Sequence, residues 1–389
     1  MLAATAALFA ACAETDLVNE VNVVAEPQAI GFETFANKAT RAEGDAAGTT
    51  TTTALEFHHK SFNVWASKKL TNENYADVYG GKTTLGIVTY DAADATIETD
   101  WKASPLKFWD KAALNYYFYA AAPTDAEWSL TSTEGIGDDN TVGTNGKFKL
   151  TGFTLAGTNL ATATSDEPVG TWINKQGDKD LMVAEPVTFN DITNYTKADP
   201  DPVSFTFRHI LSKLNIQVKG IDLTDYDAKI YLNALDVVGL NNVADYTEST
   251  EDCDWSNWEK TVNPLTLKGG WNGTSLELPN GYVYTHEYLV IPQTVDYTAW
   301  MNQGTAPNVP YIYIDYNVTT TENSETFTEN FKSYYGLADI FGNAALNFAE
   351  GGQYTLSVSI APDVIEFNTT ETPWTEQHTQ GENPDVDIK

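Results

Sequence analysis

Cysteine is nearly absent from this chain of 389 residues, which contains only Cys12 and Cys253. Cys12 closes an apolar N-terminal segment that we interpret as a leader, so Cys253 is the single thiol of the mature chain. One thiol cannot form an intramolecular disulfide, and the fold does not depend on one. Asp252 and Asp254 flank Cys253 and disfavour its thiolate, which argues against a catalytic role for this cysteine.

Basic residues are also scarce, with 22 Lys and Arg against 54 Asp and Glu and a formal net charge of -32. Phosphate binding needs Lys and Arg, so this balance excludes DNA, RNA and anionic membrane surfaces as electrostatic partners. The acidity indicates either solubility at a crowded surface or divalent-cation binding. The local candidates for a cation, Asp138-Asp139-Asn140 and the pair Asp199 and Asp201, lack the EF-hand spacing. We therefore expect no metal site and no cofactor.

Catalytic motifs are missing as well. The sequence has no Gly-x-Ser-x-Gly elbow and no phosphate-binding glycine loop. It has five histidines, and we interpret His209 as a structural histidine. Carboxylates are so abundant that pairing two of them as a glycosidase acid and base carries no information. Trp255, Trp258 and Trp271 can either stack on sugar rings or pack in the core. Nothing in these patterns predicts an enzyme.

No apolar run after the leader is long enough to span a bilayer. The leader itself, residues 1–11, carries no charge and ends in Leu8-Phe9-Ala10-Ala11-Cys12. Small residues before a cysteine are typical of a bacterial lipoprotein signal, which predicts a signal peptide over residues 1–11 and acylation of Cys12. A plain secretory signal cut near Ala11 is the alternative.

Aromatic residues are plentiful, with 20 Tyr, 17 Phe and 10 Trp, and they favour pleated, half-buried surfaces. Short segments of period-two alternation recur along the chain, which predicts an all-β fold of sandwich type. Two prolines in Asp199-Pro200-Asp201-Pro202 predict a domain boundary near residue 200, and a helix is expected only around residues 333–341. The clearest expected strands are residues 30–34, 61–65, 86–90, 114–120, 148–155, 203–207, 229–232, 287–291, 311–316 and 353–360.

A basic site follows the first of these strands. Lys38-Ala39-Thr40-Arg41-Ala42 lies between the strand at residues 30–34 and a Gly, Ala and Thr linker that ends in five threonines. An arginine between a strand and a flexible linker is accessible to proteases. The pattern predicts cleavage by a trypsin-like enzyme between Arg41 and Ala42.

Several motifs in a fixed order resemble the fimbrillin family, the lipoprotein-derived pilins of Bacteroidales-type surface fibres (type V pili). The resemblance begins at the lipobox and the Arg41 site and extends over nearly the whole chain. Its most specific stretch is Phe205-Thr206-Phe207-Arg208-His209-Ile210-Leu211-Ser212-Lys213-Leu214. The other motifs are Tyr117-Phe118-Tyr119-Ala120, Asp180-Leu181-Met182-Val183-Ala184, Tyr288-Leu289-Val290-Ile291-Pro292-Gln293 and Gly352-Gln353-Tyr354-Thr355-Leu356.

This resemblance implies two tandem transthyretin-like β-sandwich domains, over residues 42–200 and 201–389. It also implies a lipid-attached propeptide over residues 12–41 and an outer-membrane or fimbrial location. An arginine-specific protease would remove a plug strand containing Ile30 and Phe32. A C-terminal strand of a neighbouring subunit would then fill the vacated groove. Here that donor segment has only Val386 and Ile388 as an alternating apolar pair.

These observations leave three alternative functions for the protein. The first is a structural fimbrial subunit that polymerises by protease-triggered donor-strand exchange and supports adhesion to a host or bacterial surface glycan or protein receptor. The second is a non-polymerising surface lipoprotein that serves as a tip, an anchor or a glycan-binding module. The third, an enzyme such as a glycosidase, has no motif in its favour.

Overall fold

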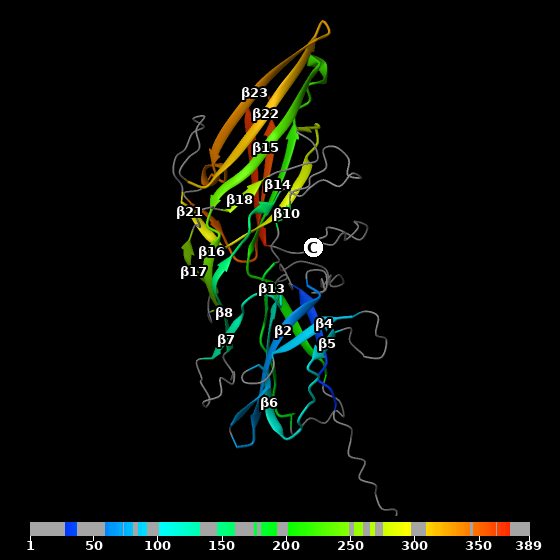
Figure 1. Ribbon diagram of the computed structural model, residues 1–389, viewed down its shortest axis with the longest axis vertical. Helices are drawn as coiled ribbons and strands as arrows, with labels where there is room; N and C mark the ends of the chain where they lie inside the picture. Colours follow the sequence, from blue (N-terminus) through cyan, green and yellow to red (C-terminus); the bar gives the residue numbers. More distant parts are fainter. Residues whose placement is uncertain are drawn as a thin grey trace, which may run out of the picture.

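The structure is a computed structural model of the chain, and it describes residues 28–36, 59–72, 74–80, 85–91, 101–132, 146–159, 175–176, 180–192, 201–248, 253–259, 265–268, 275–296, 309–342, 345–362 and 364–373. These residues form strands almost throughout, which confirms the all-β prediction. The molecule is elongated in Figure 1, and the residues before about 200 lie largely at one end of it. Within the described residues, no helix is long and apolar enough to cross a membrane.

The first sheet has nine strands in the order β12-β6-β11-β13-β1-β5-β4-β2-β3, and a further pairing of β6 with β2 closes it on itself. β2 and β6 pair along their whole length, from Asn63 opposite Ala121 to Leu70 opposite Ala113. β6 is therefore covered on both edges and is buried on both faces, as its aromatic sequence predicts. The strands are β1 (Phe32–Ala36), β2 (Ser61–Leu70), β3 (Tyr75–Tyr79), β4 (Gly86–Tyr90), β5 (Trp101–Ser104), β6 (Ala113–Ala122), β11 (Met182–Ala184), β12 (Val187–Phe189) and β13 (Val203–His209).

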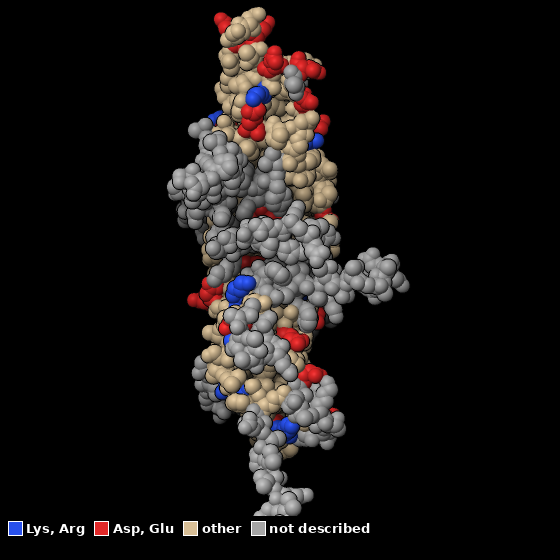
Figure 2. Space-filling view, turned by 90° about the vertical axis from the view of Figure 1, so that its right-hand side faces the viewer, with Lys and Arg blue, Asp and Glu red and all other residues tan. Residues whose placement is uncertain are grey.

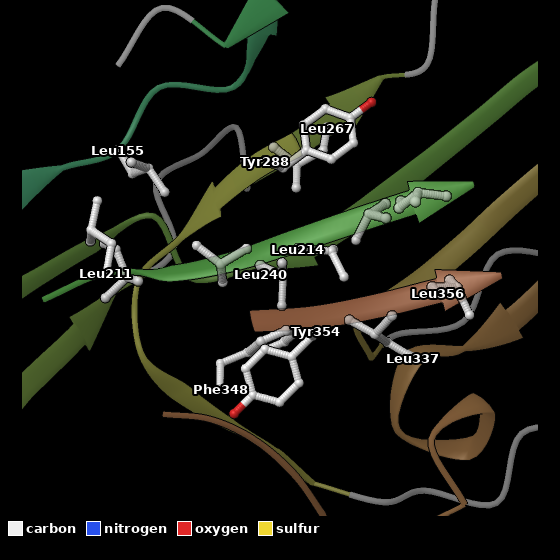
Figure 3. Packing of buried hydrophobic residues seen from close by; sticks show 14 of the residues in the cluster. Leu155, Leu211, Leu214, Leu240, Leu267, Tyr288, Leu337, Phe348, Tyr354 and Leu356 are labelled. Atoms are coloured by element: carbon white, nitrogen blue, oxygen red, sulfur yellow. The ribbon is translucent and has the colours of Figure 1, made fainter. Parts of the chain in front are cut away.

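Two further sheets enclose a second core. One has the order β20-β14-β25-β26, and the other has the order β18-β15-β22-β23 with β19 paired to β15. Figure 3 shows Leu214, Leu356 and Tyr354 packed in this core. The four-stranded sheet consists of β14 (Ser212–Gly220), β20 (Val283–Val290), β25 (Gly352–Ile360) and β26 (Ile365–Pro373). The five-stranded sheet consists of β15 (Ala228–Leu240), β18 (Leu265–Lys268), β19 (Leu276–Glu277), β22 (Tyr311–Glu322) and β23 (Glu325–Gly336).

A four-stranded sheet joins the two parts of the chain. In the order β17-β16-β8-β7, it pairs β7 (Ser129–Ser132) and β8 (Gly146–Thr154) with β16 (Val243–Glu248) and β17 (Cys253–Glu259). Phe148 of β8 and Leu155 just beyond it belong to the same hydrophobic cluster as Leu214. The remaining small elements are β9 (Thr158–Asn159) with β10 (Lys175–Gln176), β21 (Gln293–Asp296) with β24 (Ala345–Phe348), a 3-10 turn (Thr224–Tyr226) and α1 (Leu337–Ile340).

The strands do not separate at residue 200. β13 begins just after the double-proline segment, yet it pairs with β1 and β11 of the first sheet. The physical reason is the alternation of Val203, Phe205 and Phe207, which places three apolar side chains in the core of that sheet. The division into two domains stays a prediction. The expected helix is confirmed only in α1, because Ser333 to Gly336 continue β23.

Candidate functional site

β1 differs from its neighbours in how it is held in the nine-stranded sheet. On one side it runs parallel to β13 over five residue pairs, from Phe32 opposite Val203 to Ala36 opposite Phe207. On the other side it meets β5 in the single pair of Phe32 with Trp101. β1 is thus bonded along its length to one strand and touches the other at one point.

The residues ahead of β1 extend this attachment. The Ile30 amide donates to the Lys107 carbonyl at 2.9 Å, and the Trp109 amide donates to the Gln28 carbonyl at the same distance. The Val203 amide donates to Gly31 at 2.9 Å. The segment from Gln28 to Ala36 therefore completes the backbone hydrogen bonding between the loop before β6 and β13.

Alternate side chains of this segment point into the core. Ile30, Phe32 and Thr34 are 2%, 0% and 6% exposed, whereas Glu33 between them is exposed. This period of two is the one expected of a strand with one buried face. We call the space between β13 and β5 that these three side chains fill the β1 slot.

Four aromatic rings surround Phe32 in the β1 slot. Its ring is stacked on Phe205 with centroids 6.1 Å apart, and it meets Phe62, Tyr79 and Phe118 at 6.2 to 6.3 Å. Burial of an aromatic side chain stabilises a fold by about 1.5–3 kcal/mol, and ring pairs add to this. Phe32 is therefore the main anchor of the strand.

The β1 slot is an apolar environment. Tyr79 is 1% exposed at its wall, and burial raises the pKa of its hydroxyl well above the ordinary value. A charged side chain in this space would lack both water and a counter-ion. The slot accordingly suits an extended segment with apolar side chains at alternate positions.

An emptied slot would expose two things at once. β13 would lose its hydrogen-bonding partner along the edge that β1 covers, and Phe62, Phe118 and Phe205 would lose their contacts with Phe32. Unpaired strand edges beside apolar surface recruit another strand. These two features together would favour the addition of a strand at this edge.

The sequence-predicted residues divide into two groups. Ile30 and Phe32 lie in the β1 slot. Cys12, Arg41, Ala42, Val386 and Ile388 lie outside the described residues. The sequence analysis did not name Thr34 as the third inward-facing residue, although the alternation of residues 30–34 indicates it. The contact between Phe32 and Trp101 has no signal in the sequence.

A charged contact anchors the far end of β13. The Arg208 guanidinium donates through Nη1 to Glu350 Oε1 and through Nη2 to Glu248 Oε1, the latter at 3.0 Å. The next residue, His209, is buried against Asp180, which fits the structural role expected of it. β13 is thus fixed to β16 and to the turn before β25 while its edge supports β1.

The other candidates give a mixed outcome. Trp255 is buried and donates to the Ile210 carbonyl at 3.0 Å, so it packs in the core. Trp258 is 45% exposed, and Trp271 lies outside the described residues. In the part of the chain that the structure describes, no three His, Cys, Asp or Glu side chains gather to hold a metal.

Comparison with known proteins identifies the family of the chain. A family model described as fimbrillin-like matches residues 40–374. Among solved structures, a fimbrial protein from Bacteroides vulgatus aligns at 16% identity and a TM-score of 0.46, covering 90% of this chain and 100% of that one. A candidate cell adhesion protein from Bacteroides uniformis aligns at 16% identity and 0.42, covering 89% and 98%. No curated protein sequence matches the chain.

Proposed function

We propose, because the chain belongs to the fimbrillin-like family, that it is a structural subunit of a cell-surface fimbria. β1 would be a temporary strand in this subunit, present until assembly. The observation that carries the proposal is the position of Phe32, fully buried among four rings on a strand that only β13 holds along its length. No catalytic step is assigned to the protein.

Cleavage between Arg41 and Ala42 would be the trigger. Before the cut, β1 is part of the same chain as β2, which keeps its effective concentration at the slot high. After the cut, only non-covalent contacts hold the segment ending at Arg41. Its loss then becomes possible, and an arginine-specific protease at the cell surface would control the timing.

A strand of a neighbouring subunit would fill the vacated slot. Addition of a strand to a sheet edge gives affinity through main-chain hydrogen bonds and specificity through alternate side chains in pockets. Val386 and Ile388 have the spacing of Ile30 and Phe32, so the C-terminal segment is the proposed donor. Export as a lipoprotein acylated on Cys12 would bring the precursor to the outer membrane.

The test of the trigger uses two single variants of the full chain. Purified precursor is treated with an arginine-specific protease and followed by sedimentation and electron microscopy. Arg41→Ala should remain uncut at this position and monomeric. Lys38→Ala, a matched loss of a nearby basic residue, should be cut and should polymerise like the unchanged chain. Polymers from Arg41→Ala would refute the trigger.

The test of the donor uses the cleaved protein. Val386→Asp combined with Ile388→Asp should abolish polymer growth, because two carboxylates cannot enter an apolar slot. Thr379→Asp adds a charge to the same segment away from the apolar pair and should leave growth intact. Equal polymerisation by both variants would show that the donor lies elsewhere.

A further inference from the structure

The outer face of β22 has an unusual composition for a surface. Ile312 and Ile314 point into the core, so Tyr311, Tyr313 and Asp315 point outward. β22 is flanked by β15 and β23 (Figure 1), and these outward residues therefore lie in the middle of a three-stranded surface. All three are half-buried, because their neighbours on the two flanking strands lie against them.

Three tyrosines form the aromatic part of this surface, and we call Tyr311, Tyr313 and Tyr334 the tyrosine platform. Tyr313 and Tyr334 are directly opposite each other on β22 and β23, with ring centroids 5.0 Å apart at an angle of 32°. Tyr311 meets Tyr334 in an edge arrangement, with centroids 5.8 Å apart at an angle of 63°. Tyr313 and Tyr334 therefore form the apolar area of the platform, and Tyr311 adjoins it at an angle.

A hydrogen-bonded polar network adjoins the tyrosine platform. Asp315 accepts hydrogen bonds from the Tyr313 hydroxyl and from Asn233 Nδ2, each at 3.0 Å, and Lys332 Nζ lies 3.4 Å from it. Asn317 Nδ2 donates to Asn233 Oδ1 at 3.3 Å. These bonds fix the side chains in advance, which reduces the entropy cost of binding.

The protonation state of Tyr313 supports this hydrogen-bonded network. Burial, followed by the bond to Asp315, raises the pKa of Tyr313 well above its ordinary value. Its hydroxyl therefore stays protonated and remains a donor. The hydroxyl donates to Asp315, and this bond holds the carboxylate in a defined position, where the remaining lone pairs of its oxygens can accept bonds from a ligand.

The negative charge around the tyrosine platform limits the classes of ligand that can bind there. Asp236 lies opposite Tyr313 on β15, and Asp315 adds a second carboxylate. Figure 2 shows Asp and Glu side chains gathered at the end of the molecule where the β22–β23 hairpin turns, and Glu322 and Glu325 at that turn are exposed. With a net charge of -32, the protein repels polyanions. An anionic polysaccharide or a nucleic acid does not fit this surface.

We propose that the tyrosine platform, with Asp315, Asn233 and Asn317, binds an uncharged oligosaccharide. The apolar C–H faces of pyranose rings would lie on the tyrosine rings, and the ring hydroxyls would bond to the carboxylate and the amides. A strand rises about 3.3 Å per residue, so Tyr311 and Asn317 are separated by about 20 Å, which accommodates several sugar rings. Binding at this surface does not depend on strand exchange at β1.

A second copy of the chain is the competing occupant of this surface. A protein contact of comparable size would be expected to present an apolar centre with a polar rim. Here Asp315 and Asn317 follow the tyrosines on the same strand, and Asn233 lies beside them on β15, so polar groups lie directly next to the rings and not only at a rim. The composition thus favours a sugar.

The experiment applies the intact full chain to an array of neutral and anionic glycans and then titrates the best neutral hexasaccharide by calorimetry. Neutral glycans should bind and polygalacturonate should not. Tyr313→Ala and Tyr334→Ala should each weaken the affinity at least tenfold. Tyr226→Ala removes a tyrosine that is 72% exposed outside the platform, and it should bind like the unchanged chain.

Near-UV circular dichroism shows whether each variant is folded. Should an alanine variant unfold, Tyr313→Phe and Asp315→Asn provide the readout, because they keep the shape and remove one hydrogen-bonding or charged group. Each should weaken binding severalfold. The proposal is overturned if no neutral glycan binds, if the folded platform variants bind as well as Tyr226→Ala, or if these variants lose self-association instead.

Discussion

At the scale of single residues, the proposed function makes Phe32, which is fully buried, the side chain that holds β1 in its slot. Replacement of a fully buried phenylalanine by alanine costs about 3–5 kcal/mol. We expect Phe32→Ala to lower the free energy of unfolding of the uncut precursor by this amount in urea denaturation. Cleavage after Arg41 removes Phe32. Cleaved protein made from the Phe32→Ala precursor should therefore be as stable as cleaved protein made from the unchanged chain.

Phe205→Ala is the control for this prediction. Phe205 stacks on Phe32 but belongs to β13, which remains after cleavage. It should destabilise both the precursor and the cleaved protein. A Phe32→Ala precursor as stable as the unchanged one would contradict the role assigned to the slot.

Arg208 is the second residue with a specific expectation. Its guanidinium bonds to two carboxylates on different elements, Glu248 and Glu350, and hydrogen bonds to charged groups are worth about 1.5–3 kcal/mol each. Arg208→Ala should destabilise the protein by about that amount in the same denaturation assay. Arg208→Lys should recover only part of it, because an ammonium does not bridge two carboxylates in this way.

An exposed ion pair provides the comparison for Arg208. Lys229 and Glu277 lie 2.8 Å apart with side chains that are 58% and 50% exposed, and solvent screens such pairs. Lys229→Ala should leave the denaturation midpoint nearly unchanged. A loss as large as that of Arg208→Ala would mean that charge in general, and not the position of Arg208, is responsible.

At the scale of elements, the start of β4 is tightly constrained by Tyr79 and Val64, which belong to the same hydrophobic cluster as Phe32. A Cβ atom on Gly86 would overlap the Tyr79 ring and the Val64 side chain, whereas one on Gly281 would meet nothing within 4 Å. Gly86→Ala should destabilise the fold by about 1–3 kcal/mol through overpacking, as measured by thermal unfolding. Gly281→Ala should be neutral, and equal effects would contradict the packing argument.

Sequence patterns predicted the individual strands better than their partners. The alternation in Phe205 and Phe207 and the aromatic run of β6 follow from period two, and both are strands. Ser333 to Gly336 were expected to be helical, yet they belong to β23, where Tyr334 pairs with Tyr313 of β22. The cross-strand pairing of this hairpin overrides local propensity, and the local pattern of residues 333–336 does not indicate it.

The candidate site was predictable to the same degree. Ile30 and Phe32 could be found because they alternate on a short strand before a basic site. The parallel pairing of β1 with β13 could not be predicted. The two strands are neighbours in the sheet, but most of its other strands lie between them in the sequence. The tyrosine platform is likewise absent from local patterns, since its rings come from β22 and β23 and the polar groups beside it come from β22 and β15.

At the scale of the whole molecule, net charge opposes assembly. The full chain has a formal charge of -32 and most of its acidic residues follow Arg41, so cleaved subunits repel one another, and salt shortens the range of this repulsion from about 10 Å at 0.1 M to about 3 Å at 1 M. Polymerisation of cleaved protein should therefore become faster as sodium chloride is raised, as followed by light scattering. Slower growth in salt would indicate that attractive charge pairs drive the subunits together.

The β8–β16 pairing makes the two parts of the molecule interdependent. Strands from before and after residue 200 share a sheet, and Phe148 and Leu155 join the second core. In the proposed fibre, a strand inserted in the β1 slot would therefore be mechanically continuous with the rest of the subunit.

The most direct measurement of the central claim is N-terminal sequencing of the high-mass form of the protein taken from its native cell surface. We predict a chain that begins at Ala42, without Ile30 and Phe32. A high-mass form that retains the segment from Gln28 to Ala36 would contradict it, because the β1 slot would then still be filled by its own strand.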